Sequence, residues 1–472
     1  MRVLLIKPPT NNVLGLEAIT LAEPLGLECI AGAVALEKHE CLIVDMRLDG
    51  ISKGMSKSRK FAPDLIGVQC NFTTERMQVL KLLDLLNNDF PGIPIIVGGH
   101  DASRDPEWFR HPAITAVGIG DGEEILPAFL QAIEENYDFK SVSGLMINTP
   151  NGSVFTEPLK PRKNADDLPM PNRQLVRSYS ERYYLGFRRP MALLETARGC
   201  PFRCNFCSVW KYHNSSYREK SVDRVLKELN ELNAPNVFIT DDIFWNDTRR
   251  AEALASAIRS SGIKRHYWIQ TRTDIIVRHP ELVRQWKELG SLTVFLGLEK
   301  LDDESLKSIN KRNSASNNNK AIEILKDLGA GYTANFIIDP DWDADDFSRL
   351  KEWVAHTDSY NSAFSVLTPL PGTDLWNDVQ DKLTTHDWEL FDLQHAVIPT
   401  KLPLDEFYSE YAGLWKHAAE LRSRSSNLMK SGLHQLSALA TGKVNISTLR
   451  KGISGNKILG DAETFLSAHE QS

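Results

Sequence analysis

The sequence predicts an α/β protein in which a doubly wound, Rossmann-like domain precedes a partial (β/α)6 barrel and a helical C-terminal region. Short apolar, β-rich runs alternate with amphipathic stretches up to about residue 135, and the alternation resumes between about residues 187 and 380. Strands and helices that alternate at this spacing build parallel sheets. From about residue 400 one long amphipathic stretch replaces the alternation, which predicts a helix.

We expect four segments along the chain. They are a Rossmann-like domain over residues 1–135, a connector over 136–186, a barrel over 187–385 and a helical region over 386–472. Strands of the first domain are predicted at 2–8, 41–46, 65–72, 94–100 and 116–122, and those of the barrel at 191–197, 236–244, 266–274, 294–300, 333–339 and 364–370. The connector contains Asn151-Gly152, which favours a hairpin turn, and ends in a proline-rich run.

Composition excludes several classes of protein. The 472 residues carry 55 Lys and Arg against 62 Asp and Glu, and a net charge of -7 argues against a dedicated nucleic-acid surface. We find no apolar run of about 18 residues that would predict a membrane span, and the N-terminal run is too short for a secretory signal. Six cysteines, three of them clustered, fit a reducing cytoplasm, where we expect the protein to act.

Three cysteines, Cys200, Cys204 and Cys207, lie in the run GCPFRCNFCSVW, and the next cysteine in the sequence is the distant Cys70. Structural zinc sites and ferredoxin clusters take four protein ligands. Three thiolates on one short loop therefore suit a [4Fe–4S] cluster whose fourth iron is open to a ligand. A zinc knuckle or three unrelated core cysteines are the alternatives. The loop follows the strand predicted at 191–197, and parallel α/β folds place their sites at such strand ends.

With Phe206 before its last cysteine, this motif resembles that of the radical S-adenosylmethionine enzymes. The resemblance implies that the three cysteines hold the cluster and that S-adenosylmethionine chelates the fourth iron through its amino and carboxylate groups. One electron from the cluster then cleaves S-adenosylmethionine to methionine and a 5′-deoxyadenosyl radical. It also implies the partial barrel fold, and a role for Phe206 in cofactor binding.

Polar residues end three further barrel strands. Asp241 and Asp242 follow the second strand, where the family contacts the amino group of S-adenosylmethionine. Arg272 ends the third strand and Glu299 the fourth. Carboxylates there can hold ribose hydroxyls or an ammonium group by charge-assisted hydrogen bonds. Helix capping by the two aspartates, and surface salt bridges for the others, are the alternatives.

The strand ends of the first domain carry a second candidate site. Gln69 and Asn71 follow the third strand, Gly98-Gly99 the fourth, and Gly120 the fifth. Glycines at the carboxyl ends of parallel strands let a ligand approach the backbone, but no dinucleotide fingerprint is present. Together with the cysteine motif, the arrangement resembles the cobalamin-binding domain that precedes the radical domain in cobalamin-dependent members. A cobalamin-free, flavodoxin-like module is the alternative.

The loop after the first strand reads KPPTNN and lacks the histidine that ligates cobalt in many cobalamin proteins. A similar spacing after the second strand has Arg47 in place of histidine. We therefore expect cobalamin to bind without a protein histidine on cobalt. His100, directly after Gly98-Gly99, is the residue that would contradict this expectation.

Residues 23–34, 336–347 and 400–408 are similar to hopanoid C-3 methylases. This resemblance implies methylation of an unactivated carbon of a lipid, with an electron donor such as flavodoxin or ferredoxin. A radical cyclase of the magnesium-protoporphyrin ester type and a non-catalytic cobalamin or redox sensor are the alternatives. Aromatic residues that either line a lipid pocket or pack the barrel are Trp210, Tyr212, Phe244, Trp245 and Trp342.

The helix predicted from residue 404 has an apolar stripe that we expect to pack against the barrel. A substrate lid or a peripheral membrane contact is the alternative for this helix. The last 25 residues are polar, and we expect them to fray.

Overall fold

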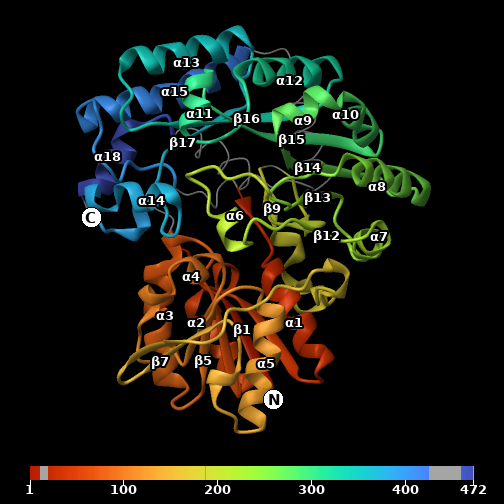
Figure 1. Ribbon diagram of the computed structural model, residues 1–472, viewed down its shortest axis with the longest axis vertical. Helices are drawn as coiled ribbons and strands as arrows, with labels where there is room; N and C mark the ends of the chain where they lie inside the picture. Colours follow the sequence, from red (N-terminus) through yellow and green to blue (C-terminus); the bar gives the residue numbers. More distant parts are fainter. Residues whose placement is uncertain (11–19, 187, 425–458, 471–472) are drawn as a thin grey trace.

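The computed structural model describes residues 1–10, 20–186, 188–424 and 459–470, and two parallel sheets within them form the centres of two domains. In Figure 1 the N-terminal domain lies below the second domain, and the short helix α6 (Val209–Tyr212) lies where the two meet. The predicted α/β class and the order of the two sheets along the chain are confirmed.

The N-terminal sheet has the strand order β3-β1-β4-β5-β6-β7-β8, and its strands are parallel from β3 to β6. This is a doubly wound order. Alternate residues of β1 point to opposite faces: Val3 and Leu5 pack beneath α1 and α5, while Leu4 and Ile6 pack beneath α2 and α3. The strands are β1 (Arg2–Lys7), β3 (Glu40–Asp45), β4 (Leu65–Gln69), β5 (Ile95–Gly98) and β6 (Ala116–Gly118), and the helices are α1 (Leu25–Leu36), α2 (Met46–Phe61), η2 (Thr73–Glu75), α3 (Arg76–Asp89), α4 (His100–Arg104), η3 (Pro106–Phe109) and α5 (Gly122–Glu134).

The connector begins as part of this first sheet. Its strands β7 (Leu145–Thr149) and β8 (Gly152–Phe155) pair antiparallel through a turn at Pro150-Asn151, one residue before the predicted Asn151-Gly152, and β7 pairs with β6. The chain then passes through the 3-10 helices η5 (Ala165–Asp167) and η6 (Arg173–Arg182) to β9 (Tyr184–Leu185), which pairs with β2 (Thr20–Leu21). The short helix η4 (Phe139–Ser141) precedes β7.

The second sheet has the order β10-β13-β14-β15-β16-β17, with every neighbouring pair parallel, as a partial barrel requires. Its strands are β10 (Met191–Leu194), β13 (Asn236–Ile239), β14 (Arg265–Thr271), β15 (Gly290–Glu299), β16 (Gly331–Ile338) and β17 (Ser362–Val366). Its helices are α7 (Val222–Glu231), α8 (Thr248–Ser261), α9 (Thr273–Arg278), α10 (Pro280–Lys287), α11 (Asp303–Ser308), α12 (Ala315–Asp327) and α13 (Ala344–His356). A two-residue ladder joins β11 (Ala197–Arg198) to β12 (Arg218–Glu219).

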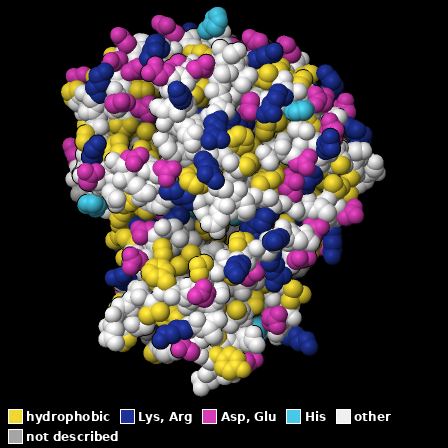
Figure 2. All heavy atoms as spheres, viewed as in Figure 1, with side chains coloured by type: hydrophobic (Ala, Val, Ile, Leu, Met, Phe, Trp, Pro, Cys, Tyr) yellow, Lys and Arg dark blue, Asp and Glu magenta, His cyan; other side chains and the backbone are white. Residues whose placement is uncertain are grey.

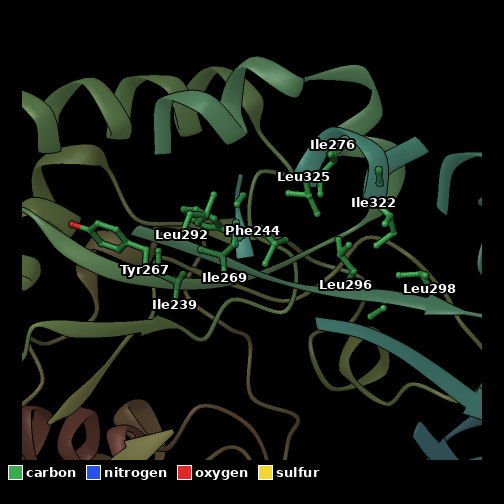
Figure 3. Close-up of a cluster of buried hydrophobic side chains, with 14 of the residues drawn as sticks. Ile239, Phe244, Tyr267, Ile269, Ile276, Leu292, Leu296, Leu298, Ile322 and Leu325 are labelled. Carbon is green, nitrogen blue, oxygen red and sulfur yellow. The ribbon is translucent and has the colours of Figure 1, made fainter. Parts of the chain in front are cut away.

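The core between this sheet and its helices is strongly apolar. In Figure 3 the side chains of Ile239 and Ile269 on the sheet lie in one cluster with Ile322 and Leu325 of α12. Phe244 also belongs to this core. For Phe244 and its neighbour Trp245, which is 2% exposed, the packing alternative therefore holds.

The chain after the barrel packs back onto it. It forms α14 (Asp374–Val379), η7 (Gln380–Lys382), η8 (Trp388–Leu390) and the predicted long helix α15 (Leu404–Arg424). Phe407 and Tyr411 of α15 join the barrel core, which confirms core packing for this helix. The expected fraying of the chain end is wrong for α18 (Ala462–Glu470), because Phe465 is fully buried and stacks on the Tyr408 ring, with the ring centroids 5.3 Å apart.

Acidic and basic side chains are interspersed over the face drawn in Figure 2. Among the helices that the structure describes, none combines the length and the apolar character needed to cross a bilayer.

We predict that Phe465→Ala lowers the free energy of unfolding by about 3 kcal/mol, because it empties a buried aromatic site. Chemical denaturation followed by circular dichroism measures the change. Leu36→Ala is the control: Leu36 is 73% exposed, and its loss should change stability by less than about 0.5 kcal/mol. Equal effects of the two substitutions would contradict the packing of α18.

Candidate active site

The cysteine loop leaves the second sheet at its carboxyl edge, after β10 and the short strand β11. Gly199 opens the loop with φ +90°, and a Cβ there would lie 2.2 Å from the Ser216 carbonyl oxygen. Only glycine fits this close approach. In the GC pair at the start of the motif, the backbone geometry therefore requires the glycine, and the cysteine is the expected cluster ligand.

Side chains from the barrel hold the loop in place. The Arg272 guanidinium lies 3.8 Å from the centroid of the Phe202 ring, and it donates to the carbonyl oxygens of Lys311 and Arg312 at 2.9 and 2.8 Å. Asn205 donates to the Ser308 carbonyl at 3.1 Å. Arg272 was predicted to bind a cofactor; in the structure it supports the loop that carries the cysteines.

The three motif cysteines are free thiols that burial makes less acidic. Burial raises the pKa of Cys200 and Cys204, and it raises that of Cys207 to about 12. Over the described residues, no three His, Cys, Asp or Glu side chains converge on a single metal position. A four-iron cluster does not need such convergence, because each thiolate binds a different iron.

The two adjacent aspartates after β13 have different surroundings. Asp241 is 1% exposed and accepts hydrogen bonds from the backbone N–H and hydroxyl of Thr196, which tie β13 to β10. Asp242 lines a cavity and accepts from the Gly199 N–H at 3.2 Å. Burial raises the pKa of Asp241 to about 7 and that of Asp242 to about 6. Only Asp242 of this pair faces space that a ligand could fill.

Glu299 and Phe206 complete the barrel residues that the sequence singled out. Glu299, at φ +65° on a bulge of β15, pairs with Lys311 at 2.6 Å. Phe206 is half-buried in the cysteine loop. Neither lines the cavity described next.

A cavity of about 1010 Å³ lies between the carboxyl ends of the two sheets. Ligand cavities of α/β proteins are expected at this edge. Its lining includes residues of the first domain (Lys7, Gln69, Asn71, Phe72, Glu75, Gly98, Gly99, His100, Gly120, Glu123), the barrel (Arg198, Ser208, Tyr212, Thr240, Asp242, Gln270) and the segment after it (Leu370, Phe391, Asp392, Leu393).

All five residues predicted in the first domain meet at this cavity. Gln69 ends β4 and Asn71 follows it; Gly98 ends β5 and Gly99 follows it; Gly120 lies after β6. A Cβ on Gly98 would have no atom within 4 Å, so the backbone there is open to the cavity. Gly99 is constrained instead: at φ +117° its Cβ would lie 2.5 Å from Asn71 Oδ1.

Sequence reasoning missed the side chains that join the two domains. Arg198, directly before Gly199, pairs with Asp121 at 3.2 Å and also with Glu123; Asp121 directly precedes α5 and Glu123 lies in its first turn. Arg218 donates to the other oxygen of Asp121 at 2.8 Å. The sequence does contain an acidic run, DGE, beside a glycine loop and an arginine beside the cysteine motif. Nothing in the sequence indicates that these residues form ion pairs with each other.

Both domains match known families. Residues 12–130 match the B12 binding domain, and residues 194–354 match the Radical SAM superfamily. The chain is 34% identical over 393 residues to the hopanoid C-3 methylase of Methylococcus capsulatus, covering 82% of this chain and 75% of that protein. It is 24% identical over 448 residues to the anaerobic magnesium-protoporphyrin IX monomethyl ester cyclase of Rubrivivax gelatinosus, covering 89% of this chain and 79% of that one.

The fold is also that of a solved structure, the cobalamin-dependent S-adenosylmethionine radical enzyme OxsB with aqua-cobalamin and S-adenosylmethionine bound. The TM-score is 0.70 at 16% identity, covering 100% of this chain and 80% of that one. Fold and site thus define a radical S-adenosylmethionine enzyme with a B12-binding domain. The chain belongs to the cobalamin-dependent radical S-adenosylmethionine methyltransferases, the class B methylase type.

Cobalamin, S-adenosylmethionine and a [4Fe–4S] cluster are the cofactors of this class, and the residues present fit them. The donor set for the cluster is three thiols on one loop, with Cys29, Cys41 and Cys70 all in the N-terminal domain. The backbone at Gly98 opens into a cavity large enough for a bulky ligand. Cobalamin would lie against the loops after β4, β5 and β6, and S-adenosylmethionine beside Asp242 and the cysteine loop.

We predict that Cys200→Ala, Cys204→Ala and Cys207→Ala each abolish cluster assembly, because removing one of three thiolates leaves an iron without its protein ligand. Iron and sulfide analysis of the reconstituted protein measures the cluster. Cys29→Ala, Cys41→Ala and Cys70→Ala should keep full iron content. A full cluster in any of the first three variants would defeat the assignment.

We predict that Gly98→Leu blocks cobalamin binding and leaves the cluster intact, because its side chain would occupy the cavity without meeting protein atoms near Cβ. Gly98→Ala should weaken binding less. Absorbance titration of the apoprotein with cobalamin gives the dissociation constants, and iron analysis is the internal control. Tight cobalamin binding by Gly98→Leu would place the cofactor elsewhere.

Proposed function

We propose that this enzyme methylates an unactivated carbon of a lipid, and specifically that it is a hopanoid C-3 methylase. The observation that carries the proposal is the identity with the Methylococcus capsulatus hopanoid C-3 methylase, which spans both domains. The cavity between those domains supplies a place for such a reaction.

An unactivated sp3 carbon has no acidic proton and no lone pair, so polar methyl transfer does not reach it. When bound, the three cofactors supply a radical that abstracts hydrogen and a methyl group that a carbon radical can accept. The protein's own residues have to place the reacting groups together and exclude water. Thr240, Asp242 and Gln270 line the barrel side of the cavity, and the glycine loops line the other.

The cavity opening has an apolar rim, which supports a hydrocarbon substrate. Phe72 is 64% exposed and Leu393 is 42% exposed, and both line the cavity, one from each domain. Leu370 and Phe391 add apolar surface beside Leu393. Burying a rigid fused-ring skeleton against such surface stabilises binding by roughly 25 cal/mol per Å², without a charged anchor.

Several charged side chains that line the cavity are paired with opposite charges. Lys7 pairs with Glu75, and Arg198 with Glu123. Asp392 accepts from His395 at 3.0 Å. Asp242 differs, because it accepts from the Gly199 N–H rather than meeting a cation. Pairing of the other groups reduces the charge that a neutral lipid would meet in this cavity.

Of the aromatic residues offered as lipid contacts, Tyr212 lines the cavity. Trp210 donates from its indole nitrogen to the Cys204 carbonyl at 3.0 Å and so braces the cysteine loop. Trp342 packs edge-on against Phe347, with the ring centroids 5.3 Å apart. Recognition of the lipid thus falls to Phe72, Leu393 and their apolar neighbours rather than to these tryptophans.

The relation to the magnesium-protoporphyrin ester cyclase favours a second candidate, radical cyclisation or oxygen insertion on a flat macrocycle. A sensor without turnover is the third. For either radical reaction we propose a flavodoxin or ferredoxin as electron donor. We also propose a cytoplasmic location, with peripheral contact to the membrane that holds a lipid substrate.

The deciding experiment supplies the reconstituted holoenzyme with a hopanoid, S-adenosylmethionine and reductant. We expect a product heavier by one methylene, about 14 Da, and two S-adenosylmethionine molecules consumed per product, one cleaved and one giving its methyl group. Mass spectrometry with methyl-labelled S-adenosylmethionine measures both. Cys204→Ala is the inactive control.

The same experiment separates the three candidates. A new ring or added oxygen without label would select the cyclase. Absence of 5′-deoxyadenosine from a protein with a full cluster would select the sensor. Either result would overturn the lipid methylation proposed here.

A further inference from the structure

The helix that follows the cysteine loop is docked on the cobalamin-binding domain at two points. His100, the first residue of α4, shares a hydrogen bond with Ser208, whose Oγ lies 2.8 Å from the imidazole Nε2. Tyr212, the last residue of α6, donates from its hydroxyl to the Gly120 carbonyl at 3.0 Å. The His100 and Tyr212 rings lie against each other, with centroids 4.7 Å apart.

Both ends of this contact are fixed to candidate cofactor loops. On the first domain, the His100 N–H donates to Asn71 Oδ1 at 3.2 Å, so the histidine is held by the loop after β4 as well as by Gly99. On the second domain, Ser208 directly follows Cys207. One imidazole therefore connects the loops expected around the corrin to the last cysteine of the cluster motif.

The imidazole is suited to a fixed neutral contact. Burial lowers the pKa of His100 to about 3, and the nearby Arg104 guanidinium acts in the same direction. Its Nε2 shares a hydrogen bond with Ser208.

We propose that His100 is a positioning residue: its hydrogen bond to Ser208 sets the distance between the cluster loop and the cobalamin-binding loops. Cleavage of S-adenosylmethionine requires the barrel and the cluster, whereas methyl transfer also requires the two domains to be correctly placed relative to each other. Misplacement by about 1 Å can cost a large factor in rate. Loss of this contact should therefore uncouple cleavage from methylation.

The test compares His100→Ala, His100→Gln and Ser208→Ala with the wild type. Gln offers a side-chain amide at similar reach and should restore the contact to Ser208. His356→Ala, an exposed histidine on α13, is the control. Iron content should stay within about twofold of the wild type in every variant, because the proposed contact supplies no ligand to the cluster.

The first readout does not depend on the substrate. Hydrogen exchange of the α6 amides in the apoprotein should accelerate about tenfold in His100→Ala and in Ser208→Ala, the effect of losing one net hydrogen bond. In the double variant the exchange should be little faster than in either single variant, because both substitutions remove the same interaction. Unchanged exchange, or full additivity, would overturn the proposal.

The second readout is the yield of methylated product per 5′-deoxyadenosine, which rests on the proposed function. We expect it to fall about tenfold in His100→Ala and to recover in His100→Gln. If the wild type makes no methylated hopanoid, the proposed function fails, while the exchange result still decides the contact. An unchanged yield would overturn the positioning role.

The third readout is the electron paramagnetic resonance spectrum of the Co(II) form. We expect no histidine nitrogen splitting in the wild type or in any variant. Splitting that disappears in His100→Ala, together with weakened cobalamin binding, would make His100 a cobalt ligand and overturn the proposal.

Discussion

The active site of this enzyme depends on the buried ion pairs that Arg198 makes across the domain boundary. Its side chain is 11% exposed, and it meets Asp121 and Glu123 of the first domain while its Nε donates to Glu195 at 2.8 Å in its own domain. Removing one partner from a buried pair costs about 3–5 kcal/mol, because the remaining charge is left without compensation. Surface pairs contribute about 1 kcal/mol or less. The orientation of the cysteine loop, which begins one residue after Arg198, follows from this contact.

Further contacts around the cavity hold the two domains in the same relative position. Arg104 of α4 donates to the Pro371 carbonyl at 2.9 Å, in the loop that closes the barrel. The Arg76 guanidinium lies against both the Trp108 and the Trp388 ring, 4.8 and 4.5 Å from their centroids, and so holds η8 against the first domain. The segment after the barrel thereby becomes one wall of the cavity. The carboxyl ends of both sheets border the cavity, and neither sheet alone encloses a ligand. The site therefore needs contacts that hold the two domains together.

Much of the fold could be predicted from the sequence, and part of the site. Both parallel sheets and the long helix α15 follow from hydrophobic periodicity, since strands buried on both faces and amphipathic helices have distinct patterns. The glycine loops and Asp242 line the cavity, because strand ends in a parallel sheet share one edge; their cofactor contacts stay a prediction. Asp241, Arg272 and Glu299 stand at equivalent strand ends, yet each is occupied by protein partners. Neighbouring residues at a strand end point in different directions, and only the packed structure shows which one faces the ligand.

The sequence by itself determined the class of this protein. The spacing of Cys200, Cys204 and Cys207 and the order of two βα domains are properties of the linear chain, so they can be read without coordinates. The tertiary structure decided how the two domains meet. The pairing of Arg198 with Asp121 spans 77 positions, and that of His100 with Ser208 spans 108. Pairings at such separation depend on where packing brings the loops, and no local pattern of residues encodes them.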